Sequence, residues 1–421
     1  MRTAFSAGSP SIALGSREPN DWPSVHLSDV CNHDIQIVDP RKHPEQPFRY
    51  IDIASVDNKL KRITEPRTLF GKEAPSRARQ RIMTGDVLVA TTRPNLNAVA
   101  QVPAELNDGI ASTGFCVLRP AKCLDSDYLF AFVRSNSFNK SLSDLVKGAL
   151  YPAVSDNQVF AQCLSLPPLP VQRRIAAHIK AQLEEVDKAR TALQAQIAAA
   201  NALPTASLRA VFGDPAYSGA GAAQVTLGEI LTLRKEVIHP RDRPTDHATF
   251  VGLEHVESGT GARLGAVELE LSALTGRKPR FYKGDIVYGY LRPYLNKVWL
   301  ADFDGVCSVD QYVYTVDRTR ADAEFVSWFM RSPRYLALAP VAETPGQLPR
   351  IRTQEVAQVP LRLPALAVQH SLAAHLRAEI DSATELRTIL EARLATLDQF
   401  PAALLRQVFG QTPQAAENLH S

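Results

Sequence analysis

The chain repeats itself, and this repetition constrains its architecture more than any other feature. Two segments, 164–213 and 361–410, both contain Leu-Pro-x-Leu-x-Val-Gln near their start and finish with Arg-x-Val-Phe-Gly. Gln172 and Gln369 are 197 positions apart, and the same offset holds to the end of both segments. About 22 of the 50 aligned positions are identical. Self-similarity on this scale predicts two copies of one structural unit.

The repetition extends towards the N-terminal side of each segment with less identity. Gly85-Asp-Val-Leu, followed by Arg93-Pro-x-Leu-Asn, recurs as Gly284-Asp-Ile-Val, followed by Arg292-Pro-x-Leu-Asn, at an offset of 199. Each copy therefore consists of a part that varies between the two copies, followed by a well-kept part in which the copies are more alike. The predicted order is a tail (1–20), a variable domain (21–165), a helical spacer (166–213), a linker (214–222), a second variable domain (223–362), a second helical spacer (363–410) and a tail (411–421).

The well-kept segments have the apolar spacing of long helices with a narrow heptad seam. The seam residues are Ile179, Leu183, Val186, Leu193 and Ile197 in the first copy, and Leu376, Ile380, Leu390 and Leu394 in the second. Both seams also contain an arginine, Arg190 or Arg387, which either pairs with Glu184, Glu185, Glu385 or Glu391 or extends to the seam edge. Pro204 and Pro401 are expected to end the helices, giving a length on the order of 45 Å.

A lone helix with so narrow a seam needs a partner, and its natural partner is its twin. The expected fold is α+β: two mainly-β domains, separated by two long antiparallel coiled-coil helices and related by a pseudo-twofold axis. The variable parts contain short β-branched and aromatic runs between Gly, Pro, Asn and Asp residues, as strands do. One amphipathic helix is expected in each domain, at 127–135 and 323–332.

Composition indicates a globular chain, with 45% hydrophobic and 22% charged residues. No apolar run approaches the ~18 residues that span a bilayer, and no signal pattern is visible near Met1, so a cytoplasmic protein is expected. The five cysteines have neither disulfide nor metal spacing and are expected to lie in the core. No metal site is predicted.

Basic residues gather just before the Gly-Asp strand of each copy, although the net charge is only +3. The two clusters are Arg77, Arg79 and Arg81, and Arg277, Lys278, Arg280 and Lys283. Equivalent clusters favour a polyanionic partner, the alternative being ordinary solvated charges. A second loop, 148–152 in the first copy and 345–349 in the second, either approaches that partner or, more simply, turns the chain.

No catalytic motif emerges from the sequence. A phosphate loop, a dinucleotide-binding Gly-x-Gly-x-x-Gly after a strand and an adenine methyltransferase signature are all missing. The chain is therefore expected to be non-catalytic and to contain no cofactor of its own.

These motifs in this order resemble the specificity subunit of type I restriction-modification systems. The resemblance covers about 22–410, and the Gly-Asp strands match a motif of that family's target recognition domains. The family usually has Glu-Gln where this chain has Val171-Gln172 and Val368-Gln369, which puts in doubt any contact made by that Glu.

The resemblance implies a double-stranded DNA partner, with each recognition domain reading one half of a bipartite site and the helices setting the gap. It also implies two modification subunits that methylate adenine with S-adenosylmethionine, and restriction subunits that use ATP and Mg²⁺. Because the two domains differ, the half-sites should differ.

The loops after the Gly-Asp strands supply the side chains most suited to DNA, since Arg can bind guanine, Asn can pair with adenine and Lys can hold phosphate. The expected DNA-facing residues are Arg93, Asn95, Asn97, Arg292, Tyr294, Asn296 and Lys297, together with Arg77, Arg79, Arg81, Lys278 and Arg280. Asn95 and Tyr294 differ at matched positions and are the better specificity candidates. The shared Arg-Pro-x-Leu-Asn is alternatively a structural turn whose arginines bond backbone carbonyls.

Two other functions remain open from the sequence. One is the specificity subunit of a type IIB-like methyltransferase-nuclease, and the other is a coiled-coil scaffold whose globular ends bind proteins. Steep salt dependence of duplex binding would favour DNA recognition over the scaffold.

Overall fold

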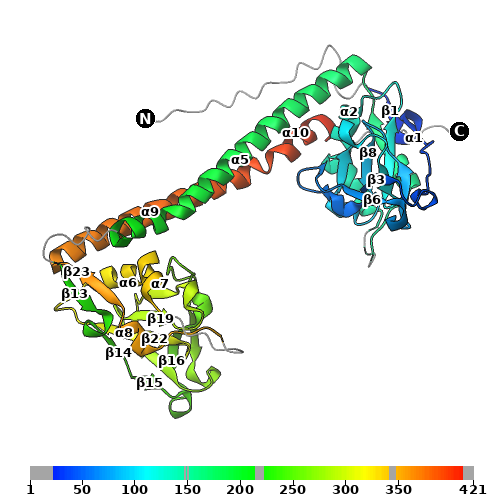
Figure 1. Ribbon diagram of the computed structural model, residues 1–421. Coiled ribbons are helices and arrows are strands. Elements are labelled where there is room, and N and C mark those ends of the chain that lie inside the picture. The colour runs from blue at the N-terminus through cyan, green and yellow to red at the C-terminus, as the bar shows by residue number, and fades with distance from the viewer. Residues whose placement is uncertain (1–21, 147, 149–150, 214–221, 341–347, 411–421) are drawn as a thin grey trace, which may run out of the picture. The chain divides into compact units, whose positions relative to one another are not determined.

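The computed structural model describes residues 22–410 except 147, 149–150, 214–221 and 341–347. The chain forms two compact units (Figure 1), one containing the chain up to Ala192 and from Leu394 onwards, the other Leu193–Arg393. The expected tails, the linker at 214–221 and parts of the second shared loop (149–150, 345–347) lie outside the described residues.

The first unit contains the first β-rich domain. Its strands are β1 (Ser24–His26), β2 (Cys31–Asn32), β3 (Pro47–Ile51), β4 (Val56–Asp57), β5 (Arg62–Ile63), β6 (Arg67–Phe70), β7 (Ala78–Arg81), β8 (Val87–Ala90), β9 (Val99–Gln101), β10 (Ile110–Ser112), β11 (Phe115–Pro120) and β12 (Cys163–Ser165). Its short helices are α1 (Leu27–Val30), α2 (Ser126–Val133), α3 (Asn136–Asp144) and α4 (Asp156–Phe160). Two four-stranded sheets, β6-β3-β10-β7 and β2-β11-β8-β9, form the body of the domain.

The second unit repeats this plan. Its strands are β13 (Ala223–Thr226), β14 (Leu231–Leu233), β15 (Val237–Ile238), β16 (His247–Val251), β17 (Val267–Glu270), β18 (Lys278–Phe281), β19 (Ile286–Gly289), β20 (Val298–Leu300), β21 (Gly305–Cys307), β22 (Gln311–Val316) and β23 (Pro360–Leu363). Its short helices are α6 (Ala323–Arg331), α7 (Pro333–Leu338) and α8 (Thr353–Ala357). The sheets β15-β18-β21-β16-β17 and β14-β22-β19-β20 correspond to those of the first unit.

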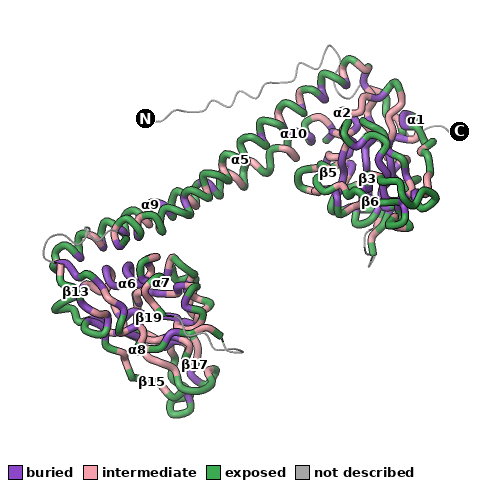
Figure 2. Tube along the Cα trace, viewed as in Figure 1, coloured by how far each residue is buried: buried purple, intermediate pink, exposed green. Residues whose placement is uncertain are grey.

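The expected strands and amphipathic helices are confirmed, since α2 and α6 begin within one residue of their predicted starts. In each domain one parallel pair, β3 with β10 or β16 with β21, lies among antiparallel neighbours. Buried positions run along the central strands (Figure 2). Among the cysteines, Cys31, Cys116 and Cys307 are buried as expected, whereas Cys123 is exposed, contrary to the expectation for a core residue.

Three long helices follow the domains: α5 (Leu169–Gly213), α9 (Leu366–Leu397) and α10 (Phe400–Phe409). In the first unit the start of α5 shares a core with α10, and in the second unit the start of α9 shares a core with the end of α5. Each unit thus pairs the start of one helix with the end of another, which makes the packing antiparallel. All nine apolar seam residues named above are buried or half-buried.

Pro204 does not end its helix, contrary to the sequence expectation. It lies inside α5, which continues to Gly213. The lost hydrogen bond and the ring clash cost about 3 kcal/mol, but Leu208 and Phe212 beyond the proline are buried at 4% exposure each. Their burial offsets this cost and keeps the last turns helical. Pro401 instead occupies the first turn of α10, where a proline is tolerated.

The seam arginines reach carboxylates. Arg190 lies 2.7 Å from Asp187 and 2.9 Å from Asp398, neither of which was among the expected partners. Arg387 lies 4.0 Å from Glu391, which was. Both arginines are only half-buried, so they extend to the edge of the seam as well as pairing there.

Candidate nucleic-acid interface

The aspartate of each Gly-Asp motif is structural. Asp86 is 1% and Asp285 4% exposed, and each accepts a backbone N–H from three residues earlier at 2.8 Å. Arg119 pairs with Asp86 at 2.8 Å, and Arg234 pairs with Asp285 at 2.8 Å. The hydrogen bond to each aspartate raises the pKa of its arginine. These ion pairs, each with a buried carboxylate and a half-buried arginine, fix the start of β8 and β19, and with them the loop that follows each strand.

The paired arginine comes from a different strand in the two domains. Arg119 belongs to β11, whereas Arg234 follows β14. In the second domain Thr315 occupies the strand position that matches Arg119, and its hydroxyl donates to Asp285 at 3.1 Å. Both copies therefore pair a buried aspartate with an arginine, but the arginine comes from a different position in the fold of each copy.

The Arg-Pro-x-Leu-Asn turns have the same backbone in both domains. Arg93 and Arg292 have φ values of 51° and 50°, and the closing Asn97 and Asn296 have 46° and 48°. Such left-handed conformations are uncommon outside glycine, and they cluster at functional sites. The N–H groups of the two arginines donate to Pro152 and Pro349 at 2.8 and 2.7 Å, so the turn is anchored to the chain that precedes each long helix.

The outer side of each turn is open. Arg93, Asn95, Arg292 and Tyr294 are exposed, Tyr294 at 60%. Neither arginine side chain makes a hydrogen bond within the described ranges, so both guanidinium groups are available to a ligand. The alternative in which these side chains bond backbone carbonyls is therefore wrong for this structure, although the turn itself is structural.

The inner side of the turn holds residues that the sequence assigned to DNA. Asn296 is 3% exposed and donates to the carbonyl of Arg331 at 2.9 Å, which corrects the expectation that it faces DNA. The Lys297 ammonium is half-buried and donates to the carbonyl of Leu253 at 2.6 Å. Asn97 is half-buried. The side chains of Asn296 and Lys297 thus hold the turn in place, a role that residue type alone does not distinguish from base contact.

The basic clusters are partly neutralised. In the first domain Arg79 lies 2.8 Å from Asp39 and Arg81 lies 4.0 Å from Asp108. Hydrogen bonds from Arg41 and Arg79 hold the pKa of Asp39 well below its usual range. Arg77 is exposed, with no ion pair among the residues described.

In the second domain Arg280 lies 3.5 Å from Glu236 and 5.0 Å from the Tyr282 ring centre. Lys278 lies 5.7 Å from the ring centre of Phe250. Arg277 and Lys283 are exposed. The most exposed cations are therefore Arg77 in the first cluster, and Arg277 and Lys283, the first and last members, in the second.

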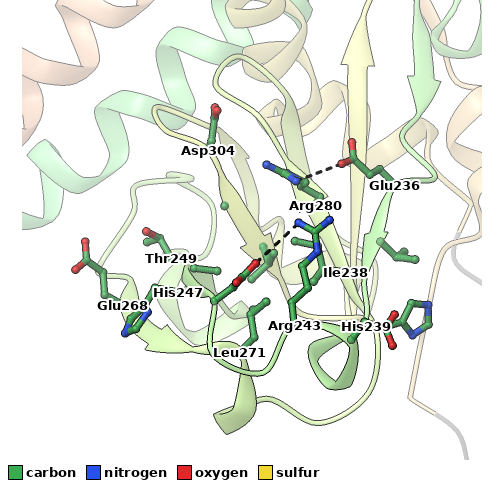
Figure 3. Close-up of a pocket in the computed structure, with 16 residues that line it drawn as sticks. Glu236, Ile238, His239, Arg243, His247, Thr249, Glu268, Leu271, Arg280 and Asp304 are labelled. Carbon is green, nitrogen blue, oxygen red and sulfur yellow. Dashed lines mark ion pairs between the residues drawn. The ribbon is translucent and has the colours of Figure 1, made fainter.

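A groove that sequence analysis missed opens on the second domain (Figure 3). It has a volume of 680 Å³ between β15, β16, β18 and β21. Ala248 lines it where the first domain has Phe48, 200 positions earlier, packed in a small apolar cluster. Its lining carboxylates (Glu236, Asp242, Asp246, Glu268 and Asp304) outnumber its arginines (Arg243 and Arg280). This balance makes the groove unsuited to a phosphate backbone.

No cluster of potential metal ligands occurs in the parts of the chain that are described. Within the same parts, no helix has both the length and the apolar character required to cross a membrane.

Comparison with known proteins identifies this architecture. No family model matches the chain. It is 29% identical over 168 residues to the type I restriction enzyme EcoDI specificity subunit of Escherichia coli, and 25% identical over 160 residues to the HindI specificity subunit of Haemophilus influenzae. These alignments cover 39% and 37% of this chain, and they span 37% and 34% of the length of the two relatives.

Solved structures match far more of the chain. A chain from a structure of complex assembly and conformational transition in a type I restriction-modification system superposes with a TM-score of 0.78 at 26% identity, covering 94% of this chain and 99% of that one. The HsdS subunit of Thermoanaerobacter tengcongensis gives a TM-score of 0.63 at 26% identity, covering 94% and 98%. Two β-rich regions, each followed by long helices that pack together, are the architecture of these matched structures. In fold over 94% of its length, and in sequence over 39% of it, the chain therefore matches the specificity subunits of type I restriction-modification systems.

Proposed function

We propose that this chain reads an asymmetric bipartite DNA site, with one half-site for each recognition domain. The observation that carries the proposal is the pair of Arg-Pro-x-Leu-Asn turns. Their backbones coincide within a few degrees in φ, while the exposed residue in the middle differs, Asn95 in one and Tyr294 in the other. A shared scaffold with different exposed side chains is what two readers of different sequences require.

The cations that both domains share are proposed to contact the DNA phosphates. Arg93 and Arg292 are identical and exposed, so they suit a sequence-independent role, whereas Asn95 and Tyr294 suit base readout. Arg77 in the first domain, and Arg277 and Lys283 in the second, are further exposed cations suited to phosphate contact. Asn296 and Lys297 support their turn, and these two residues and the half-buried Asn97 are left out of the proposed contact set.

The long helices set the spacing between half-sites and dock two modification subunits, which in turn recruit the restriction subunits. Helix α5 has 45 residues, or about 68 Å at ~1.5 Å per residue. S-adenosylmethionine, ATP and Mg²⁺ would belong to those partners.

A domain exchange tests the proposal. Residues 21–165 are replaced with the first recognition domain of another specificity subunit, and the methylated motif is read by methylome sequencing of cells that contain the complete system. One half of the motif should change while the other half and the spacer stay the same. An unchanged motif would refute the assignment. Protein-protein association that is insensitive to salt, without duplex binding, would favour the scaffold instead.

A further inference from the structure

Arg134, directly after α2, is a half-buried cation that has no ion pair within 4.0 Å among the described residues. Its Nε atom is buried, and in the described structure no hydrogen bond satisfies it. The nearest aromatic contact is the Phe130 ring, whose centre lies 5.1 Å from the guanidinium carbon. Burial lowers the pKa of Arg134 to about 10, so the side chain stays charged at neutral pH. A buried N–H donor that lacks a hydrogen bond is costly, and proteins rarely retain one.

The second domain provides an internal control at the matched residue, Arg331, 197 positions later. Arg331 donates to the carbonyl of Thr260 at 2.6 Å, to the hydroxyl of Ser327 at 3.1 Å and to the carbonyl of Ser327 at 3.3 Å. It also lies 3.7 Å from the ring centre of Trp328. The arginine of the second domain therefore makes three hydrogen bonds and a close ring contact, whereas in the first domain its counterpart has, among the described contacts, the more distant Phe130 ring.

Three substitutions account for this difference. Phe130 and Ala131 stand where the second domain has Ser327 and Trp328, and Lys61 stands where it has Gly261. A Cβ at Gly261 would come within 2.8 Å of Arg331 Cδ, so glycine allows the turn to close over that arginine. In the first domain the loss of the indole and the hydroxyl leaves space and removes a hydrogen-bond acceptor.

The space is a cavity of 210 Å³ between the first domain and α5. Lys61, Ala131 and Arg134 line it on the domain side, and Ile179 and Leu183 line it on the helix side. Its carboxylates pair with other cations or are exposed, and the charge of Asp187 also favours the charged form of Arg134. Asp127 lies 3.8 Å from Lys180 and Asp187 lies 2.7 Å from Arg190, while Glu184 is exposed.

Lys61 adds a second cation to this cavity. Its only hydrogen bond in the described chain is to the carbonyl of Asn97, at 2.5 Å. Burial, and then the charge of Arg134, lower the pKa of Lys61 to about 8. A cation whose charged form is disfavoured by burial and by a second cation is stabilised by an anion placed between the two.

We propose that this cavity binds a phosphate group between the Arg134 guanidinium and the Lys61 ammonium. A guanidinium fork and an ammonium point charge are the usual ligands of phosphate oxygens. Because Lys61 also bonds the turn that contains Arg93, the phosphate can come from the backbone of bound DNA or from a free phosphate compound. Only the DNA source rests on the proposed function.

Free phosphate is tested on the full chain by thermal unfolding at constant ionic strength. Inorganic phosphate at about five times its Kd should raise the Tm by about 2–4 °C. Ala131→Trp introduces the residue of the second domain and fills the cavity, and Lys61→Gly introduces the glycine found there. Both variants should lose the shift, whereas Lys59→Ala, an exposed residue of the same turn, should keep it.

The DNA source is tested by duplex binding over a salt series. Lys61→Gly should weaken binding to cognate and unrelated duplexes equally, and it should reduce the slope of log affinity against log salt by about one. Lys59→Ala should leave this slope unchanged. A lost Tm shift with an unchanged slope assigns the site to free phosphate. A changed slope assigns it to DNA. Absence of both effects overturns the proposal, whereas failure of the chain to bind any duplex overturns the proposed function and leaves the thermal test intact.

Discussion

The ring of Phe409 lies 5.8 Å from the ring of Phe132, so the end of the second repeat completes the core of the first domain. Phe212 holds the matched position in the second unit, 5.6 Å from Phe329. Both pairs are edge-to-face contacts, and both sets of residues are 197 positions apart. The Phe-Gly ending is therefore the same in both repeats because the phenylalanine of each repeat packs into the domain core of the other repeat.

Phe409→Ala should destabilise the first unit by about 3–5 kcal/mol, because it leaves a cavity against Phe132 and Tyr128. Amide hydrogen exchange should accelerate in α2 and leave α6 unchanged. Phe212→Ala is the matched control and should reverse this pattern. Equal acceleration in both helices for either variant would contradict the separate cores.

Gln369→Glu should make stability depend on pH. The Gln369 side chain is fully buried, accepts from the Asp322 N–H at 2.8 Å and donates to the carbonyls of Pro364 and Arg320 at 2.7 and 3.1 Å. A carboxylate there would face two carbonyl oxygens without water, so its folded-state pKa should rise above the unfolded value of ~4.3.

A raised folded-state pKa contributes stability below the unfolded pKa that is lost as pH rises. Urea unfolding should therefore find the Gln369→Glu variant closest to the parent near pH 4 and progressively weaker towards pH 8. Gln369→Met removes the same hydrogen bonds without a charge, and its deficit should not change with pH. A pH-independent deficit in both variants would contradict this account.

Arg119→Ala should cost about 3–5 kcal/mol, since it leaves the Asp86 carboxylate buried without its cation. Arg81→Ala is the control, because Arg81 is exposed and its carboxylate partner Asp108 is exposed as well. Chemical denaturation of both variants measures the difference. Similar losses would indicate that water or another group satisfies Asp86.

Asn95→Tyr, which introduces the residue of the second domain, should alter the first half-site and leave the second unchanged. Tyr294→Asn should do the opposite. Methylome sequencing reads both outcomes, and unchanged motifs in both variants would remove these side chains from base readout. Arg93→Ala should instead weaken binding to all sequences alike and reduce the salt slope by about one.

Much of the fold followed from the sequence, because the repeat aligns every element twice and the heptad spacing identifies the helix seams. The site followed less well. Asn97 and Asn296 closed each motif in the expected place, but a motif does not reveal which side of a turn is buried. The unpartnered Arg134 was equally hidden, because its environment depends on residues 61 and 131, which are distant in sequence. The expectation that Pro204 ends its helix is wrong because the low helix propensity of proline is offset by the burial of Leu208 and Phe212, which a local sequence pattern does not reveal.

Pro204→Ala should stabilise the second unit by up to about 3 kcal/mol, since alanine restores the hydrogen bond to the carbonyl of Ala200 and removes the ring clash. Pro401→Ala at the matched position should have little effect, because a proline in the first turn of α10 sacrifices no helical bond. Thermal unfolding of both variants makes the comparison. Equal effects would mean that the helix breaks at Pro204 after all, and that Phe212 reaches its core through a turn.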